Sequence, residues 1–347
     1  MPEAIRVDLY SDTLTQPSAA MRRFMCDAPV GDEQRGEDPT VNRLQALVAE
    51  LLGKEAALFL PSGTMCNEIA FAVHCRPGDE ILMDRTAHPL NFEAGAPAVL
   101  SGAQIHPLDG RRGIFSAAQV EAAIRPRSRY AARSRLLAVE QITNLGGGAV
   151  WPLDELRAVA GVAQRHGLAT HLDGARLLNA VTASGVAARD YAAGFDSAWI
   201  DFSKGLGAPM GAVLAGSAEF VEEAWYWKQR LGGALRQAGI VAAAGIYALE
   251  HHVERLAEDH AHARILARGL AALPGIGLDP AEVEANIILF DVAGTGLSAA
   301  EFVRRLREEH GVRLGAFGPS TVRAITHLDV SRAGISQALE AVARLLG

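Results

Sequence analysis

The feature that most constrains the fold is an alternation of short strand-like runs with longer helical stretches over the first two-thirds of the chain. The helical stretch at 40–53 has apolar residues at helical spacing and ends at a glycine. Such alternation predicts a mostly parallel α/β sheet whose functional side chains lie at the strand ends. The strand-like runs are 56–60, 80–83, 98–100, 135–139, 169–172, 198–202 and 211–215.

The pattern changes in the last third of the chain. An alanine-rich helical stretch at 240–273 ends at a Pro-Gly break, and it is followed by alternating strand-like and helical segments. A chain of 347 residues also exceeds the size at which a single core stops growing. We therefore expect an N-terminal arm and large domain at 1–250 and a smaller α+β domain at 251–347.

Composition excludes several classes of function. The net charge of −7 and the pI near 5.9 argue against nucleic acid as a partner. No apolar stretch approaches the length of a membrane span and no signal-peptide core is present, so we expect a cytoplasmic protein without a membrane partner. The three cysteines lack metal-binding spacing, so neither a disulfide framework nor a metal site is expected.

A lysine follows one of the strand-like runs. Ser203 and Lys204 come directly after the apolar run 198–202 and open a glycine-rich turn. A lysine held at a strand end beside a hydroxyl is placed to act as an amine nucleophile. An isolated S-K-G sequence is more often a surface loop. The hypothesis therefore depends on other parts of the chain.

A carboxylate ends the preceding strand-like run. The apolar segment 168–172 stops at Asp173, three residues before Arg176, and a helix-length gap separates Asp173 from Lys204. Pyridoxal phosphate needs a carboxylate that keeps its ring nitrogen protonated, and a lysine from another strand that binds its aldehyde. Asp173 and Lys204 fit these two roles.

Two further stretches could complete such a site. Ser62, Gly63 and Thr64 follow a strand-like run and begin a helical pattern, where hydroxyls and free N–H groups can bind a phosphate. Alone, S-G-T is also a common helix cap. His88 lies at a loop, where an imidazole could stack on a flat cofactor, although a lone histidine more often has a structural role.

These motifs, in this order, resemble those of the low-specificity L-threonine aldolases, which are fold-type-I pyridoxal-phosphate enzymes in the β-eliminating lyase/threonine aldolase group. The resemblance covers nearly the whole chain. It implies a lyase that cleaves a 3-hydroxy-α-amino acid, of the L-threonine or L-allo-threonine type, to glycine and an aldehyde. The matching runs include HLDGARLLNA from His171, DFSKGLGAPMG from Asp201, LRQAGI from Leu235 and TVRAITHLDV from Thr321.

The resemblance also implies roles for individual residues. Lys204 and His88 are the expected catalytic residues, with Lys204 bound to the cofactor and His88 over its ring. The expected pyridoxal 5'-phosphate contacts are Ser62, Gly63, Thr64, His88, Asp173, Arg176, Ser203 and Lys204. The expected substrate contacts are Ser11, Arg35, Thr143, Arg176 and Arg323. Related enzymes build each site from two chains, so a homodimer or homotetramer is expected.

The sequence departs from the family pattern near the substrate. Arg35 replaces a usual tyrosine, and Thr143 replaces the second active-site histidine. Arg35 could favour an acidic 3-hydroxy amino acid, or it could turn outward to pair with Glu33, Glu37 or Asp38. Three alternatives stay open: an aldolase for a different amino acid, a pyridoxal-phosphate β-eliminating lyase, and an inactive scaffold. The intact Lys204, Asp173 and Arg323 argue against the scaffold.

Overall fold

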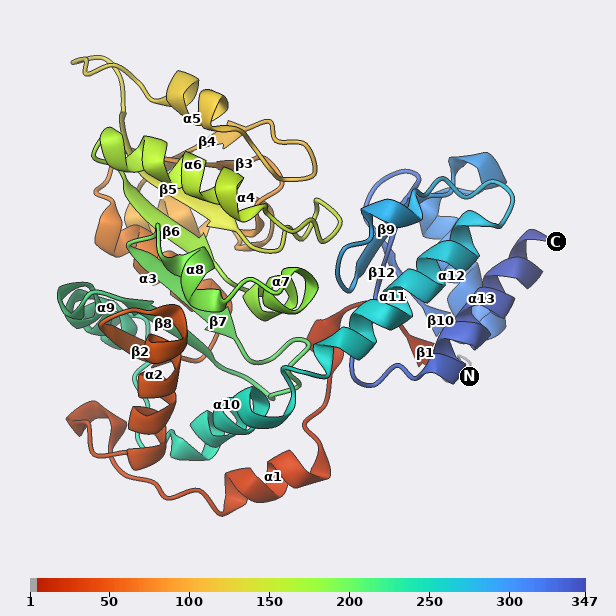
Figure 1. The fold of residues 1–347 in the computed structure, drawn as a ribbon, viewed down its shortest axis with the longest axis horizontal. Helices are drawn as coiled ribbons and strands as arrows, with labels where there is room; N and C mark the ends of the chain where they lie inside the picture. The colour runs from red at the N-terminus through yellow and green to blue at the C-terminus, as the bar shows by residue number, and fades with distance from the viewer. Residues whose placement is uncertain (1–4) are drawn as a thin grey trace.

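A seven-stranded sheet forms the centre of the larger part of the molecule (Figure 1). The computed structural model of the protein describes residues 5–347. Strand β8 runs antiparallel to both of its neighbours, and the other six strands are parallel to one another. Across the sheet the strands are β2 (Ala56–Leu60), β8 (Ala212–Gly216), β7 (Ser197–Asp201), β6 (Ala169–Asp173), β5 (Arg133–Glu140), β3 (Asp79–Asp84) and β4 (Gln104–Leu108).

Helices cover both faces of this sheet. Side chains alternate along a strand, so Leu58 and Leu60 of β2 pack with α3 and α9, whereas Ala57 and Phe59 pack with α2, α6 and α10. None of the helices in residues 5–347 has the length and apolar character needed to cross a membrane. The helices are α1 (Ala19–Cys26), α2 (Pro39–Leu52), α3 (Gly63–His74), α4 (His88–Phe92), α5 (Ala117–Ala123), α6 (Leu153–Arg165), α7 (Leu177–Ser184), α8 (Ala188–Ala192), α9 (Ala218–Arg230), α10 (Gly239–His251), α11 (Leu256–Ala271), α12 (Ala299–His310) and α13 (Arg332–Leu346).

A second core lies in the smaller part of the chain. The antiparallel strands β11 (Gly315–Ala316), β12 (Thr321–Ile325) and β9 (Ile287–Asp291) pack with α11, α12 and α13. Strand β1 (Val7–Asp8) pairs with β10 (Val312–Arg313), so the start of the chain lies beside its last third (Figure 1). The division at residues 250/251 stays a prediction.

Two expectations from the sequence were wrong. Residues 98–100 are not a strand but part of a π-helical turn, Pro97–Ser101, and the edge strand is β4. The fixed φ of Pro97 suits the start of a helical turn, and Val99 is 79% exposed, unlike a core strand residue. The helical stretch 240–273 is also two helices, α10 and α11. They separate near His252, whose ring bonds the carbonyl of Leu206.

The segment after β1 ties the two cores together. Asp12 is fully buried and accepts hydrogen bonds from Nε and Nη2 of Arg176, both at 2.7 Å, and from Asn286 at 3.1 Å. Burial alone would raise the pKa of Asp12, but the Arg176 guanidinium holds it well below its ordinary value. Three residues on, the Thr15 hydroxyl donates to the carbonyls of Ser203 and Lys204. The arm therefore braces the lysine-bearing turn.

We expect Asp12→Ala to lower the free energy of unfolding by about 3–5 kcal/mol, because it leaves the buried Arg176 charge without its partner. Urea denaturation measures this cost. The matched control is Asp8→Ala, which removes a partly exposed carboxylate from Arg313 and should cost no more than about 1 kcal/mol. Equal costs for the two variants would contradict the bracing role of Asp12.

Candidate active site

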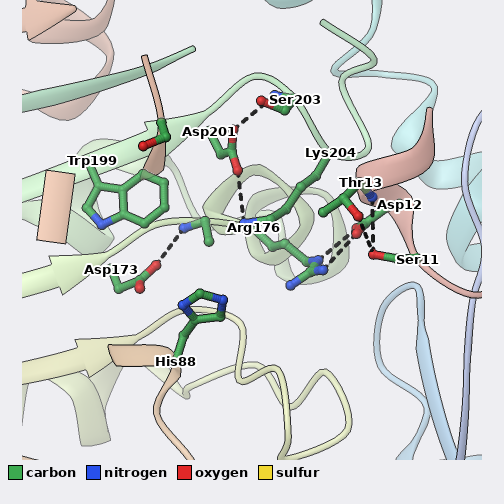
Figure 2. A network of polar contacts seen from close by, with 12 residues as sticks. Ser11, Asp12, Thr13, His88, Asp173, Arg176, Trp199, Asp201, Ser203 and Lys204 are labelled. Carbon is green, nitrogen blue, oxygen red and sulfur yellow. Dashed lines mark hydrogen bonds and ion pairs between the residues drawn. The ribbon is translucent and has the colours of Figure 1, made fainter. Parts of the chain in front are cut away.

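Several predicted site residues gather at the carboxyl edge of the sheet, namely Ser11, His88, Asp173, Arg176, Ser203 and Lys204 (Figure 2). Asp173 is the last residue of β6, and Lys204 follows the end of β7, the neighbouring strand. Helix α3 begins just after β2, and His88 begins α4 after β3. Because these strands are parallel, their ends meet at one edge, as the sequence predicted.

Asp173 is almost completely buried and is held from two sides. Its Oδ2 accepts a hydrogen bond from Nδ2 of Asn67 at 2.9 Å, and its Oδ1 accepts one from the backbone N–H of Ala175 at 2.9 Å. Burial raises the pKa of Asp173, while the charge of Lys204 opposes the rise. A cationic group bound at this carboxylate would favour its ionised form.

Asn67 was missed by the sequence analysis. Its Nδ2 also donates to Oε1 of Glu93 at 2.9 Å, and its Oδ1 accepts hydrogen bonds from Trp199 at 2.8 Å and from the His171 ring at 3.1 Å. The amide thus connects Asp173 to three other side chains. The only available signal was a polar residue on the apolar face of the helical pattern that follows Thr64.

The sequence holds three lysines, and the structure gives two of them other partners. Lys54 donates to the carbonyls of Ala192 and Phe195, and the fully buried Lys228 forms an ion pair with Glu33. Lys204 instead lies at the candidate site, with Nζ 2.9 Å from Oδ2 of Asp201. Its side chain is 16% exposed, so its amine can be reached from the site.

The N-terminus of α3 packs closely against the site. A Cβ on Gly63 would lie 2.3 Å from the Trp199 ring, so only glycine allows this approach. The hydroxyl of Ser62 accepts a hydrogen bond from the N–H of Met65 and so caps the helix. Helix capping was the other role that the sequence analysis considered for the S-G-T segment. Within residues 5–347 the hydroxyls of Thr64 and Ser203 have no hydrogen-bond partner. They and the first N–H groups of α3 are therefore available to an anion.

His88 is half-buried and points into the group of predicted residues (Figure 2). Its Nδ1 lies 2.8 Å from Oε1 of Glu93, a buried carboxylate that the sequence analysis did not identify. Glu93 lies five residues after His88 and directly follows helix α4. Its only signal in the sequence was that it is the one acidic residue in the segment 88–101.

Two buried arginines form the opposite side of the site. Arg323 donates from Nη1 to Asn144 at 2.7 Å and lies 3.9 Å from the centroid of the Phe317 ring, while its buried Nε has no partner among the described residues. Burial and the neighbouring charge of Arg176 lower the pKa of Arg323 to about 10. Asp12 faces Arg176, which leaves Arg323 without a carboxylate of its own in residues 5–347. An anionic ligand would supply one.

Three predicted substrate residues have partners within the chain. The Ser11 hydroxyl accepts from the N–H and hydroxyl of Thr13, beside Asp12 (Figure 2). The Thr143 hydroxyl is buried and accepts the N–H of Ala149. The Arg35 side chain is 73% exposed and lies 3.7 Å from Asp32, not from the neighbours considered in the sequence. Their contacts to a substrate stay predictions.

Comparisons with known proteins agree with this geometry. A model of the beta-eliminating lyase family matches residues 8–293. The low specificity L-threonine aldolase of Escherichia coli is 41% identical over 332 residues, which cover 95% of this chain and 96% of that protein. Low-specificity L-threonine aldolase 1 of Arabidopsis thaliana is 38% identical over 339 residues, covering 96% and 94%.

The fold comparison gives the same result. The structure of a threonine aldolase from Leishmania major superimposes with a TM-score of 0.85 at 21% identity, over 98% of this chain and 100% of that one. These similarities confirm the fold-type-I architecture and the lyase class expected from the sequence. The chain therefore belongs to the beta-eliminating lyase family and, within it, to the low-specificity L-threonine aldolases.

Proposed function

We propose that this protein is a pyridoxal-phosphate-dependent aldolase that cleaves a 3-hydroxy-α-amino acid of the L-threonine type to glycine and an aldehyde. The observation that carries the proposal is the placement of Asp173 and Lys204 at the ends of adjacent strands. His88 lies at the same site (Figure 2), and the incompletely paired Arg323 lies near Arg176. The names of the full-length relatives support the same reaction.

The residues fit the cofactor in four places. Asp173 would contact the ring nitrogen, and Lys204 would bind the aldehyde carbon. The free hydroxyls of Thr64 and Ser203, with the N-terminus of α3, would hold the phosphate. His88 would cover one face of the ring. When bound, pyridoxal phosphate supplies an electron sink for the bond that breaks at Cα.

Arg323 would bind and orient the substrate. Its buried guanidinium lacks a carboxylate partner in the described chain, and a planar fork of donors matches the α-carboxylate of an amino acid. Arg176 lies close enough to lower the pKa of Arg323, so the substrate carboxylate would meet two positive charges.

His88 would remove the β-hydroxyl proton. The Glu93 carboxylate accepts from Nδ1, which leaves the lone pair of the neutral ring on Nε2. Thr143 does not provide a second base, because its hydroxyl is bound to Ala149 and a hydroxyl is a weak base near neutral pH. A single imidazole would then carry the proton transfer, where the family pattern has a second active-site histidine.

We infer a cytoplasmic homodimer or homotetramer with sites at the subunit interface and a small amino acid as its ligand. The exposed Thr64 and half-exposed His88 support this inference, because a second chain could cover them. The exposed Arg35 would then reach a substrate only across such an interface. A β-eliminating lyase is the less favoured alternative, since the relatives from Escherichia coli and Arabidopsis thaliana, which match over nearly their full length, are aldolases by name.

Replacing Lys204 with alanine should abolish both the visible absorption of bound cofactor and glycine release, because no other lysine occupies the site. Lys54→Ala is the matched control, since Lys54 binds backbone carbonyls instead. It should keep the absorption band. A wild-type protein with this band should release glycine from at least one member of a panel of 3-hydroxy amino acids. A band without any glycine release would overturn the proposed function.

Replacing Arg35 with tyrosine should leave the ratio of kcat/KM for threonine and 3-hydroxyaspartate within a factor of about five, the effect expected of an exposed ion pair. Steady-state kinetics on both substrates measure the ratio. A change of tenfold or more toward threonine would show that Arg35 contacts the substrate across a subunit interface and selects an acidic side group. Light scattering on the same samples shows whether a second chain is present.

A further inference from the structure

Two buried carboxyl groups lie behind His88. Glu68 and Glu93 are 2% and 3% exposed, and their carboxyl groups lie close enough for Glu93 to raise the pKa of Glu68. Oε1 of Glu93 accepts from Nδ1 of His88 at 2.8 Å and from Nδ2 of Asn67 at 2.9 Å. Within residues 5–347, no N–H or hydroxyl reaches the other three oxygens, Oε2 of Glu93 and both oxygens of Glu68.

Only a shared proton satisfies this arrangement. Two adjacent buried carboxylates repel each other strongly, so one of the pair stays neutral. Glu93 is the better site for the charge, because two N–H groups point at it, whereas Glu68 has no donor other than the shared proton. Burial, and then Glu93, raise the pKa of Glu68 to about 9. Glu68 therefore holds a proton at neutral pH.

We propose that Glu93, with its charge stabilised by the neutral Glu68, is a positioning residue that fixes the His88 tautomer and stabilises the protonated ring during Cα–Cβ cleavage. This role rests on the proposed aldolase function. In the step, the β-hydroxyl proton passes to Nε2 of His88 and the O–H electrons form the aldehyde carbonyl. The Cα–Cβ electron pair stays with the glycine fragment, which later takes up a proton.

Other charged groups around the pair do not replace this role. Asp173 approaches from β6 but is separated from Glu93 by the amide of Asn67. Cys66, on α3, is neutral because burial and then the nearby carboxylates raise the pKa of its thiol. Lys204 pairs with Asp201. Glu93 is the carboxylate in contact with His88, and Thr143 offers no second base.

The kinetic test compares holoenzymes of wild type, Glu93→Gln, Glu68→Leu and Glu68→Gln. In Glu93→Gln, kcat/KM should fall tenfold or more with little change in KM, and the acid limb of its pH profile should move to lower pH. The reason is that a neutral amide cannot stabilise an imidazolium. Glu68→Leu should also lose activity, and Glu68→Gln should recover most of it, because its amide can donate to Glu93.

Glu80→Gln is the matched control. Glu80 is a buried glutamate 3.4 Å from a histidine, His106, but it lies near the opposite end of β3 from His88. Its replacement weakens a longer carboxylate–histidine contact and the ion pair with Arg125 without touching His88, so the pH profile should keep its wild-type shape. An acid limb that moves equally in Glu80→Gln and Glu93→Gln would assign the effect to general destabilisation and overturn the proposal.

A second readout does not depend on activity. The infrared difference spectrum between wild type and Glu68→Gln at neutral pH should contain the band of one buried carboxylic acid, because the contribution of Glu140 is common to both proteins and cancels. Glu68 retains in the folded protein a proton that it releases in the unfolded chain, so its contribution to the free energy of unfolding should fall as pH rises from 4.5 to about 9. Glu140, whose pKa burial and Asp173 raise to about 8, contributes in the same direction. Glu68→Gln should therefore reduce this slope without removing it.

The possible outcomes are distinct. An active wild type whose acid limb does not move in Glu93→Gln, or whose infrared spectrum shows Glu68 ionised, overturns the positioning role alone. A wild type that binds cofactor yet releases no glycine overturns the proposed function, and the role of Glu93 in it, even where the carboxylic acid band is present. A shifted limb, recovery in Glu68→Gln and the infrared band together support the inference.

Discussion

The side-chain amide of Asn67 is the contact on which the site depends. Its two donor hydrogens reach Asp173 and Glu93, and its oxygen accepts from Trp199 and His171. Each of these groups is buried, and a buried polar group without a partner is costly. One amide therefore orients the carboxylate expected at the ring nitrogen and the carboxylate behind His88. Asn67 therefore holds both Asp173, on the cofactor side of the site, and Glu93, on the proton-transfer side.

The rest of the site divides into an anion-binding half and an acid–base half. Asp12 pairs with Arg176, and no carboxylate in residues 5–347 pairs with Arg323, so the first half has room for the charge of a substrate. The second half holds one imidazole, that of His88, because Thr143 occupies the position of the family's second histidine. The Thr143 hydroxyl accepts the N–H of Ala149 in its own loop. The central claim is therefore that His88 alone carries the proton transfer, with Glu93 and Glu68 behind it.

The sequence predicted those features that depend on local pattern. Asp173 and Lys204 could be found because each ends an apolar run, and parallel strands bring such ends together. The strand placed at 98–100 was wrong because Pro97 starts a helical turn, which apolar content alone does not reveal. Asn67, Glu68 and Glu93 were missed because single polar residues in a helix or loop have no periodic signal. Asp12 meets Arg176 across 164 residues, a pairing that no spacing rule predicts.

The most direct test of the central claim is the turnover number of His88→Asn, measured on protein that retains its cofactor absorption. If His88 is the base, kcat for retro-aldol cleavage should fall by roughly a hundredfold or more, as general acid–base groups generally contribute. The asparagine can still contact Glu93, so the surrounding network should persist. A variant with bound cofactor and near-normal turnover would show that His88 only covers the ring and that the base lies elsewhere.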